Sequence, residues 1–264
     1  MQNHILKTNE CMIIPKSIIN KSIKALENNT LSSVLKIQKE IDKRLKNFKN
    51  FKIGIVRTFT LETQISFVKL ALSILPVKTE LKLSDLNNIE QELLDSQSNI
   101  LSWSPDIILI LWRIEELIPN LVEDYYNFSN TNLLKLQKQL KLRISKLIKN
   151  YNKISDTPIL ISTLPISHLV NNDNYKEKIS LQEFLEEINH HILQEIRKNK
   201  NVYLYDFNKW SNTVGKLFYD KKMDFYAKQP ISLNYIGNFS LFLSKSLRPF
   251  IHTSAKAIAI DLDN

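Results

Sequence analysis

The feature of this sequence that most constrains its fold is an alternation of short apolar runs with amphipathic helical segments. The runs have the length and β-branched composition of buried strands, and they lie at residues 52–56, 77–83, 107–111, 158–162 and 202–205. Successive parallel strands need a crossover connection, which is usually a helix. The alternation therefore predicts an α/β fold: a three-layer α/β/α sandwich around a five-stranded parallel sheet.

The predicted helices lie between these runs. Thr60 is placed to cap a helix that carries Leu61, Ile65, Val68 and Leu72, and Ser180 with Glu183 forms a capping box for another. Further helices are expected at residues 89–94, 133–151, 181–196 and 232–246, the last one ending before Arg248 and Pro249. A flavodoxin-like or SGNH-like sandwich satisfies this order of elements.

The domain organisation follows from the same pattern. Residues 1–50 are predicted to form an N-terminal helical arm, because residues 31–48 carry apolar side chains at helical spacing opposite a Lys-rich face. Residues 51–250 are predicted to form an SGNH-like α/β domain. A sixth apolar strand at residues 256–260 begins a separate unit that spans residues 256–264.

Composition excludes several classes of function. The formal net charge is +9, but the chain is rich in Lys, Asn and Ile throughout, so the charge alone does not indicate nucleic-acid binding. Three glycines are too few for a Gly-rich phosphate loop. The single cysteine, Cys11, permits no internal disulfide, and no apolar run is long enough to span a bilayer. We expect a cytoplasmic protein with neither nucleic acid nor membrane as a partner.

The last nine residues carry a more specific signal. Lys256–Asn264 reads KAIAIDLDN, an apolar strand followed by two aspartates in a D-x-D arrangement. This resembles motif I of the HAD phosphatases, and the DLDN form resembles the FkbH-like subfamily. Upstream strings have the order and spacing of that family, and they lie at residues 57–62, 92–95, 104–106 and 223–232. The resemblance covers roughly residues 30–264.

The resemblance implies a chemistry. Asp261 would be the nucleophile that attacks phosphorus, Asp263 the general acid and base, and both would be ligands of Mg²⁺. Residues two apart on a strand share a face, so both carboxylates can meet one substrate. The family is associated with loading a glyceryl unit from an acyl phosphate onto an acyl carrier protein. Because the later HAD motifs are absent from this sequence, the chain alone is expected to lack phosphatase activity.

The ends of the predicted strands suggest a second site. They bring Thr58, Thr60, Arg113 and Ser162 toward one rim of the sheet, where open parallel sheets bind ligands. We assign these four as candidate substrate-binding residues. Arg113 is expected to be the one cation near the rim, able to hold a phosphate or a carboxylate. Its alternative role is an ion pair with an acidic residue, for which Glu115, Glu116 and Asp206 are the candidates.

The helix within residues 125–155 has six lysines and Arg143 but no acidic residue. It is either a solvated face or a docking surface for an acidic partner such as a carrier protein. Two further functions stay open: a non-catalytic interaction module or truncated remnant, and an SGNH-like hydrolase that uses Thr58 or Ser162. The hydrolase is disfavoured, because Gly-x-Asn-Asp does not follow the third strand and no histidine lies within residues 220–232.

Overall fold

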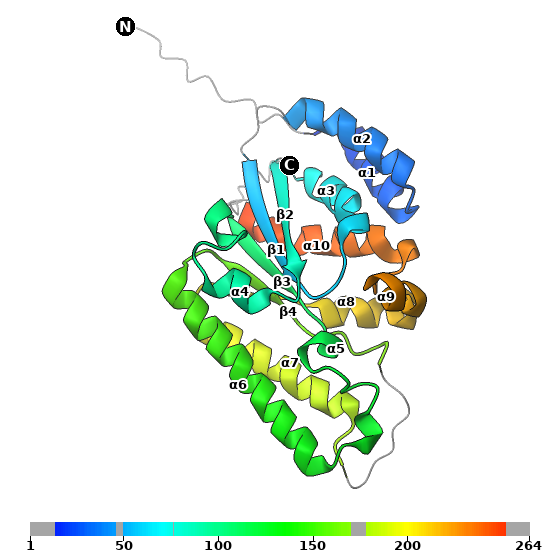
Figure 1. Cartoon of the computed structure of the whole chain (residues 1–264). Coiled ribbons are helices and arrows are strands. Elements are labelled where there is room, and N and C mark those ends of the chain that lie inside the picture. The colour runs from blue at the N-terminus through cyan, green and yellow to red at the C-terminus, as the bar shows by residue number, and fades with distance from the viewer. Residues whose placement is uncertain (1–13, 46–49, 76, 170–177, 252–264) are drawn as a thin grey trace, which may run out of the picture.

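The computed structural model describes residues 14–45, 50–75, 77–169 and 178–251. Its centre is a five-stranded sheet in which every pair of neighbours is parallel, with the order β2-β1-β3-β4-β5 (Figure 1). The strands are β1 (Asn50–Arg57), β2 (Lys78–Leu86), β3 (Ile107–Leu111), β4 (Ile159–Ser162) and β5 (Val202–Tyr205). The predicted α/β class and five-stranded parallel sheet are confirmed, and the order is that of flavodoxin-like folds.

Ten helices surround the sheet in the described part of the chain. They are α1 (Lys16–Glu27), α2 (Leu31–Arg44), α3 (Ile65–Ser73), α4 (Ile89–Leu94), α5 (Ile114–Leu117), α6 (Asn130–Ile154), α7 (Leu181–Lys198), α8 (Phe207–Val214), α9 (Lys221–Ala227) and α10 (Ile236–Ile251). Helices α4 to α7 cover one face of the sheet, and α1, α2, α3, α8 and α10 lie on the other (Figure 1).

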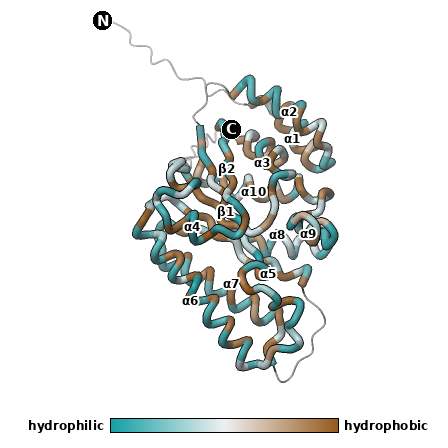
Figure 2. Tube along the Cα trace, in the orientation of Figure 1, coloured by the Kyte–Doolittle hydropathy of each residue, from teal (hydrophilic) through white to brown (hydrophobic). Residues whose placement is uncertain are grey.

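Alternate strand residues feed two hydrophobic cores. In β3, Ile107, Leu109 and Leu111 belong to the core beneath α3 and α10. Ile108 and Ile110 belong to the core beneath α6 and α7. All five side chains are fully buried, which explains why β3 is an unbroken apolar run in the sequence. Along α6, hydrophobic residues recur among hydrophilic ones (Figure 2), as expected for a helix with one buried face.

The predicted capping box begins α7 as expected. Ser180 accepts a hydrogen bond from the Glu183 backbone, and the Glu183 carboxylate accepts one from the Ser180 backbone. The prediction that Thr60 caps a helix is wrong. A 3₁₀ turn at Glu62–Gln64 comes first, and α3 begins only at Ile65, because Thr60 bonds instead to the end of α9.

Helix α10 begins and ends later than the helix predicted at residues 232–246, since a 3₁₀ turn occupies Leu233–Tyr235 and α10 begins at Ile236. It runs through Arg248 and Pro249 to Ile251. Proline disfavours a helix interior because it lacks an N–H and crowds the preceding turn. Pro249 lies in the final turn, so the disturbance falls at the end of the helix, and the expected stop before Arg248 is wrong. The predicted strand at residues 256–260 lies outside the described residues.

The N-terminal region contains a pair of helices where one was predicted. The helix expected at residues 31–48 corresponds to α2, and the unpredicted α1 precedes it. The pair packs onto α3 and α10 through buried side chains that include Ile18, Leu26 and Val34. The contact with α10 is close, since a Cβ added at Gly237 would lie 1.8 Å from the Leu26 carbonyl oxygen.

Candidate functional site

Three of the four predicted rim residues meet at the carboxyl edge of the sheet. The Arg113 backbone N–H donates to Thr58 Oγ1 at 3.2 Å, which ties the end of β3 to the end of β1. The Trp112 indole donates to the Ser162 carbonyl oxygen at 2.7 Å, which ties β3 to β4. Thr58 and Ser162 are 3% and 0% exposed. Both residues are buried, so the geometry does not favour a nucleophilic role for either.

Arg113 is buried within a cluster of carboxylates. Its side chain is 2% exposed; Nη1 donates to Asp224 Oδ2 at 2.8 Å and Nη2 to Glu116 Oε1 at 2.5 Å. Glu115 Oε1 lies 3.9 Å from Nη1. Arg113 therefore forms the ion pairs that were its alternative predicted role, and Glu115 and Glu116 are two of the three predicted partners. Asp206 is not among the partners that the structure gives Arg113.

Asp206 has a local task instead. Its carboxylate accepts from the Lys209 backbone and from the Thr163 hydroxyl, and so it caps α8. The third carboxylate on Arg113 comes from α9, 111 residues along the chain. No local pattern in the sequence could have indicated that partner.

His168 and Tyr219 extend the contacts around Arg113. His168 Nε2 lies 3.2 Å from Glu115 Oε1, and its side chain is 1% exposed. The Tyr219 hydroxyl donates to Asp224 Oδ2 at 2.8 Å. The ring centroids of His168 and Tyr219 lie 4.5 Å apart. We call the six residues Arg113, Glu115, Glu116, His168, Tyr219 and Asp224 the Arg113 network.

The network shifts the pKa values of its members in different directions. Burial favours the neutral form of Glu115, but the hydrogen bond with His168 and the charge of Arg113 outweigh it and lower the pKa to about 2. Burial dominates at Glu116 and raises its pKa above the ordinary value despite Arg113. Burial and then the Asp224 carboxylate raise the pKa of the Tyr219 hydroxyl. Three carboxylates, those of Glu115, Glu116 and Asp224, surround the single guanidinium of Arg113.

Helix α9 closes the carboxyl edge above the Arg113 network. The Thr60 hydroxyl donates to the Ala227 carbonyl oxygen at 2.6 Å, and the Thr60 N–H donates to the Lys228 carbonyl oxygen at 2.7 Å. Asp224 reaches down from the same helix to Arg113. The place where a ligand would be expected is therefore occupied by the chain's own α9.

A second cation at this edge was not predicted. Arg57, at the end of β1, is 4% exposed and forms a two-point ion pair with Glu62 at 2.5 and 2.6 Å. The expectation that Arg113 is the one cation near the rim is therefore wrong. The hydrogen bond from Arg57 lowers the pKa of Glu62 to about 2. An arginine at a strand end, followed five residues later by a glutamate, was the available signal.

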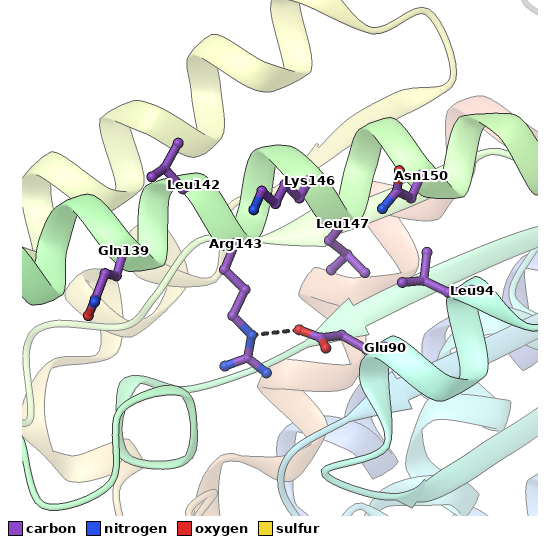
Figure 3. Close-up of a pocket in the computed structure, with 8 residues that line it drawn as sticks. All are labelled: Glu90, Leu94, Gln139, Leu142, Arg143, Lys146, Leu147 and Asn150. Atoms are coloured by element: carbon purple, nitrogen blue, oxygen red, sulfur yellow. Dashed lines mark hydrogen bonds and ion pairs between the residues drawn. The ribbon is translucent and has the colours of Figure 1, made fainter.

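A different kind of surface lies between α4 and α6. An open groove of about 530 Å³ runs between them and is lined by Glu90, Leu94, Gln139, Leu142, Arg143, Lys146, Leu147 and Asn150 (Figure 3). Arg143 extends from α6 across the groove, and its Nε donates to Glu90 Oε1 at 2.6 Å. Both side chains are 50% exposed. The volume is within the range of ordinary ligand sites.

Around this groove α6 presents a basic surface with apolar residues in it. The exposed lysines are Lys135, Lys138, Lys146, Lys149 and Lys153. Leu134 and Leu142 are 46% and 52% exposed among them. Lys141 pairs with Glu187 of α7 at 2.8 Å. We call the exposed lysines and leucines of α6, together with Arg143, the α6 face.

The motif I aspartates lie outside the described residues, so the roles of Asp261 and Asp263 stay predictions. Among the residues that the structure describes, no group of three or more His, Cys, Asp or Glu side chains is arranged to hold a metal ion. In the same part of the chain, no helix has the length and apolar character needed to cross a membrane.

The parallel sheet, its strand order and its two helical layers define a doubly wound α/β domain. The family described as "FkbH, N-terminal domain" matches residues 63–243, and the chain belongs to this family. No curated protein matches the chain.

A solved structure shares the fold. It is the N-terminal part of the protein BF1531 from Bacteroides fragilis, described as containing a phosphatase domain complexed with Mg. The TM-score is 0.62 at 15% identity, and the match covers 78% of this chain and 55% of that one. The chain therefore spans about half the length of that relative. At this identity the likeness concerns the fold alone.

Proposed function

We propose that this chain is the partner-binding α/β domain of an FkbH-like HAD phosphotransferase, and that its α6 face receives an acyl carrier protein. The observation that carries the proposal is the charge of α6, which has six lysines and Arg143 and no acidic residue in Asn130–Ile154. Carrier proteins are acidic, and complementary potentials speed encounter and select partners. Membership of the FkbH N-terminal family supports the same reading.

The resemblance of the C-terminal residues supplies the chemical part of the proposal. Asp261 would attack the phosphate ester of a phosphoglyceryl donor to give a phospho-aspartate, and Asp263 would protonate the departing glyceryl oxygen and then activate water to release phosphate. The carboxylate oxygens of both are the donor type that Mg²⁺ prefers, and the ion would neutralise charge on the phosphoryl group. In this proposal the acyl phosphate of the donor stays intact until the thiol of the bound carrier attacks its acyl carbon, so that a glyceryl thioester forms and phosphate leaves. The protein works in the cytoplasm.

A binding titration tests the partner assignment. The acyl carrier protein of the source organism is titrated into the chain at low and at raised salt. Affinity is expected to fall steeply with salt, because the lysines of the α6 face lie in solvent. Lys146→Glu with Lys149→Glu is expected to lower the affinity roughly tenfold, since each exposed charge contributes up to about 1 kcal/mol.

The matched control reverses two lysines on another helix. Lys36 and Lys39 are exposed on α2, so Lys36→Glu with Lys39→Glu changes the net charge equally on the opposite layer. That variant is expected to bind like wild type. Equal losses of affinity in both double variants would show that the effect comes from the net charge of the protein and not from the α6 face. Binding that does not respond to salt would contradict docking on the α6 face.

A further inference from the structure

The open groove between α4 and α6 offers several kinds of binding group (Figure 3). Arg143 and Lys146 bring positive charge to it. Gln139 and Asn150 place a side-chain amide at either end. Its other walls are three leucines and one carboxylate: Leu94, Leu142, Leu147 and Glu90. A ligand that uses the whole groove therefore combines an anionic group, hydrogen-bonding groups and short aliphatic segments.

The two cations can bind an anion without giving up the contacts they have. Arg143 uses Nε for Glu90 and Nη1 for the Leu117 carbonyl oxygen, which leaves Nη2 for a further acceptor. Lys146 is exposed and has no hydrogen bond or ion pair with any other described residue. Residues three apart on a helix are surface neighbours, so both side chains can reach one phosphodiester.

The carrier protein of the proposed function bears its thiol on a phosphopantetheine arm. From the protein outward, the arm has a phosphodiester, a dimethyl-substituted carbon, a hydroxyl, two amides and the thiol. We propose that the groove between α4 and α6 receives this arm, with the phosphodiester on Arg143 and Lys146. This inference rests on the proposed function and deepens it, because it locates the reactive part of the carrier as well as its surface.

The binding groups of the groove follow one another in the order of the groups of the arm. Next to the two cations, Leu147 of α6 and Leu94 of α4 provide an aliphatic wall for the dimethyl-substituted carbon. Asn150 follows along α6, and its side-chain amide can both donate to and accept from an amide of the arm. The match therefore extends over three successive positions of the groove and sets the direction of the arm.

This direction takes the thiol toward the amino edge of the sheet. The arm has about thirteen bonds from phosphorus to sulfur, which span roughly 15 Å at the advance per bond of an extended chain. About ten helical residues cover that length, so an arm that starts at Arg143 ends beside the last turn of α6, which finishes at Ile154. At the same edge α10 ends close to β5, where the ring centroids of Phe250 and Tyr203 lie 4.7 Å apart. The thiol is therefore carried toward the edge at which the sequence continues to Asp261.

The experiment compares two forms of the same carrier protein: the holo form, which has the arm, and the apo form, which lacks it. Both are titrated into the whole chain. The holo form is expected to bind roughly five- to ten-fold more tightly, since the arm adds a charge contact and apolar contacts in the groove. Equal affinities of the two forms overturn the inference and leave docking on the α6 face intact.

Two lysine variants show whether the groove is responsible. Lys146→Gln removes a cation of the groove, and Lys149→Gln removes another exposed charge of α6. Both are expected to weaken binding of the apo form alike, because both lower the charge of the α6 face. Lys146→Gln alone is expected to reduce the ratio of holo to apo affinity, by about three- to five-fold. A ratio that Lys146→Gln leaves unchanged overturns the inference.

Free 4′-phosphopantetheine separates this inference from the proposed function. Its addition is expected to shift the side-chain amide resonance of Asn150, which is assigned with Asn150→Ala. An unshifted resonance overturns the inference, whether or not the carrier binds. A shift without binding of either carrier form supports the groove as the site of the arm while contradicting the proposed function.

Discussion

Arg113 and Arg143 each join separate helices through carboxylates, but they do so in opposite environments. Arg113 is 2% exposed and bonds to Glu116 and Asp224. Arg143 is 50% exposed and bonds to Glu90, which is equally exposed. A buried charge must keep its partners, because water cannot replace them, whereas an exposed charge can exchange them at little cost. The carboxyl edge is therefore suited to holding the fold together, and the α6 face to meeting other molecules.

The largest expected difference comes from removing each guanidinium in turn. Arg113→Met leaves three carboxylates without their cation, and we expect the free energy of unfolding to fall by about 3–5 kcal/mol. Arg143→Met should cost about 1 kcal/mol or less. Urea unfolding of both variants measures the difference. Similar losses would remove the distinction between the two arginines.

Acid provides the next test. The pKa of Glu115 is lowered to about 2 in the folded protein, so its contribution to stability is complete above its ordinary pKa of 4.5. That contribution is lost as the pH falls from 4.5 toward 2, with a total on the order of 3 kcal/mol. The raised pKa of Glu116 acts in the opposite direction, since protonation relieves its burial.

Unfolding measured as a function of pH separates these contributions. Glu115→Gln is expected to be less stable than wild type at neutral pH and to lose less stability in acid. Glu90→Gln is the control in the exposed pair, and its acid dependence should follow wild type because solvent screens that pair. An acid dependence unchanged by Glu115→Gln would contradict the role assigned to the His168 and Arg113 contacts.

A milder comparison keeps side-chain shape and removes one charge. Asp224→Asn weakens the bond between α9 and Arg113 and should reduce stability by about 1–3 kcal/mol, because a buried hydrogen-bonding group is left poorly matched. It should also lower the pKa of Tyr219, which the Asp224 carboxylate raises. The chain has nine tyrosines, so the part of the alkaline absorbance titration that Tyr219→Phe removes gives that pKa. An unchanged value in Asp224→Asn would separate Tyr219 from the Arg113 network.

The sequence predicted the sheet well because each central strand is covered on both faces. Such strands are unbroken apolar runs, and the predicted residues 107–111 match β3. The prediction at residues 202–205 also matches β5, which is an edge strand with Tyr203 exposed. Helices with one buried face were also recognisable, and the capping box predicted where α7 begins. Segments whose local pattern competes with a long-range contact were not. Thr60 has the chemistry of a helix cap, but its hydroxyl bonds to Ala227.

The candidate site was predictable only in part. The topology brought Thr58, Arg113 and Ser162 together as expected, since carboxyl ends of parallel strands meet. The contacts with Asp224 and Tyr219 come from a region more than 100 residues away, which no periodicity encodes. The basic character of α6 was visible in the sequence, whereas the groove beside it depends on where α4 packs.

The docking of the N-terminal helices on α10 has a consequence for synthesis. Asn29 donates to the Asn234 carbonyl oxygen across a separation of 205 residues, and Leu26 touches Gly237 beside it. At ordinary translation rates the ribosome needs roughly 10–40 s to make that intervening length. During this interval the apolar face of α1 and α2 lacks its final partner. A chaperone that shields nascent apolar helices would find this hairpin available until α10 emerges and covers it.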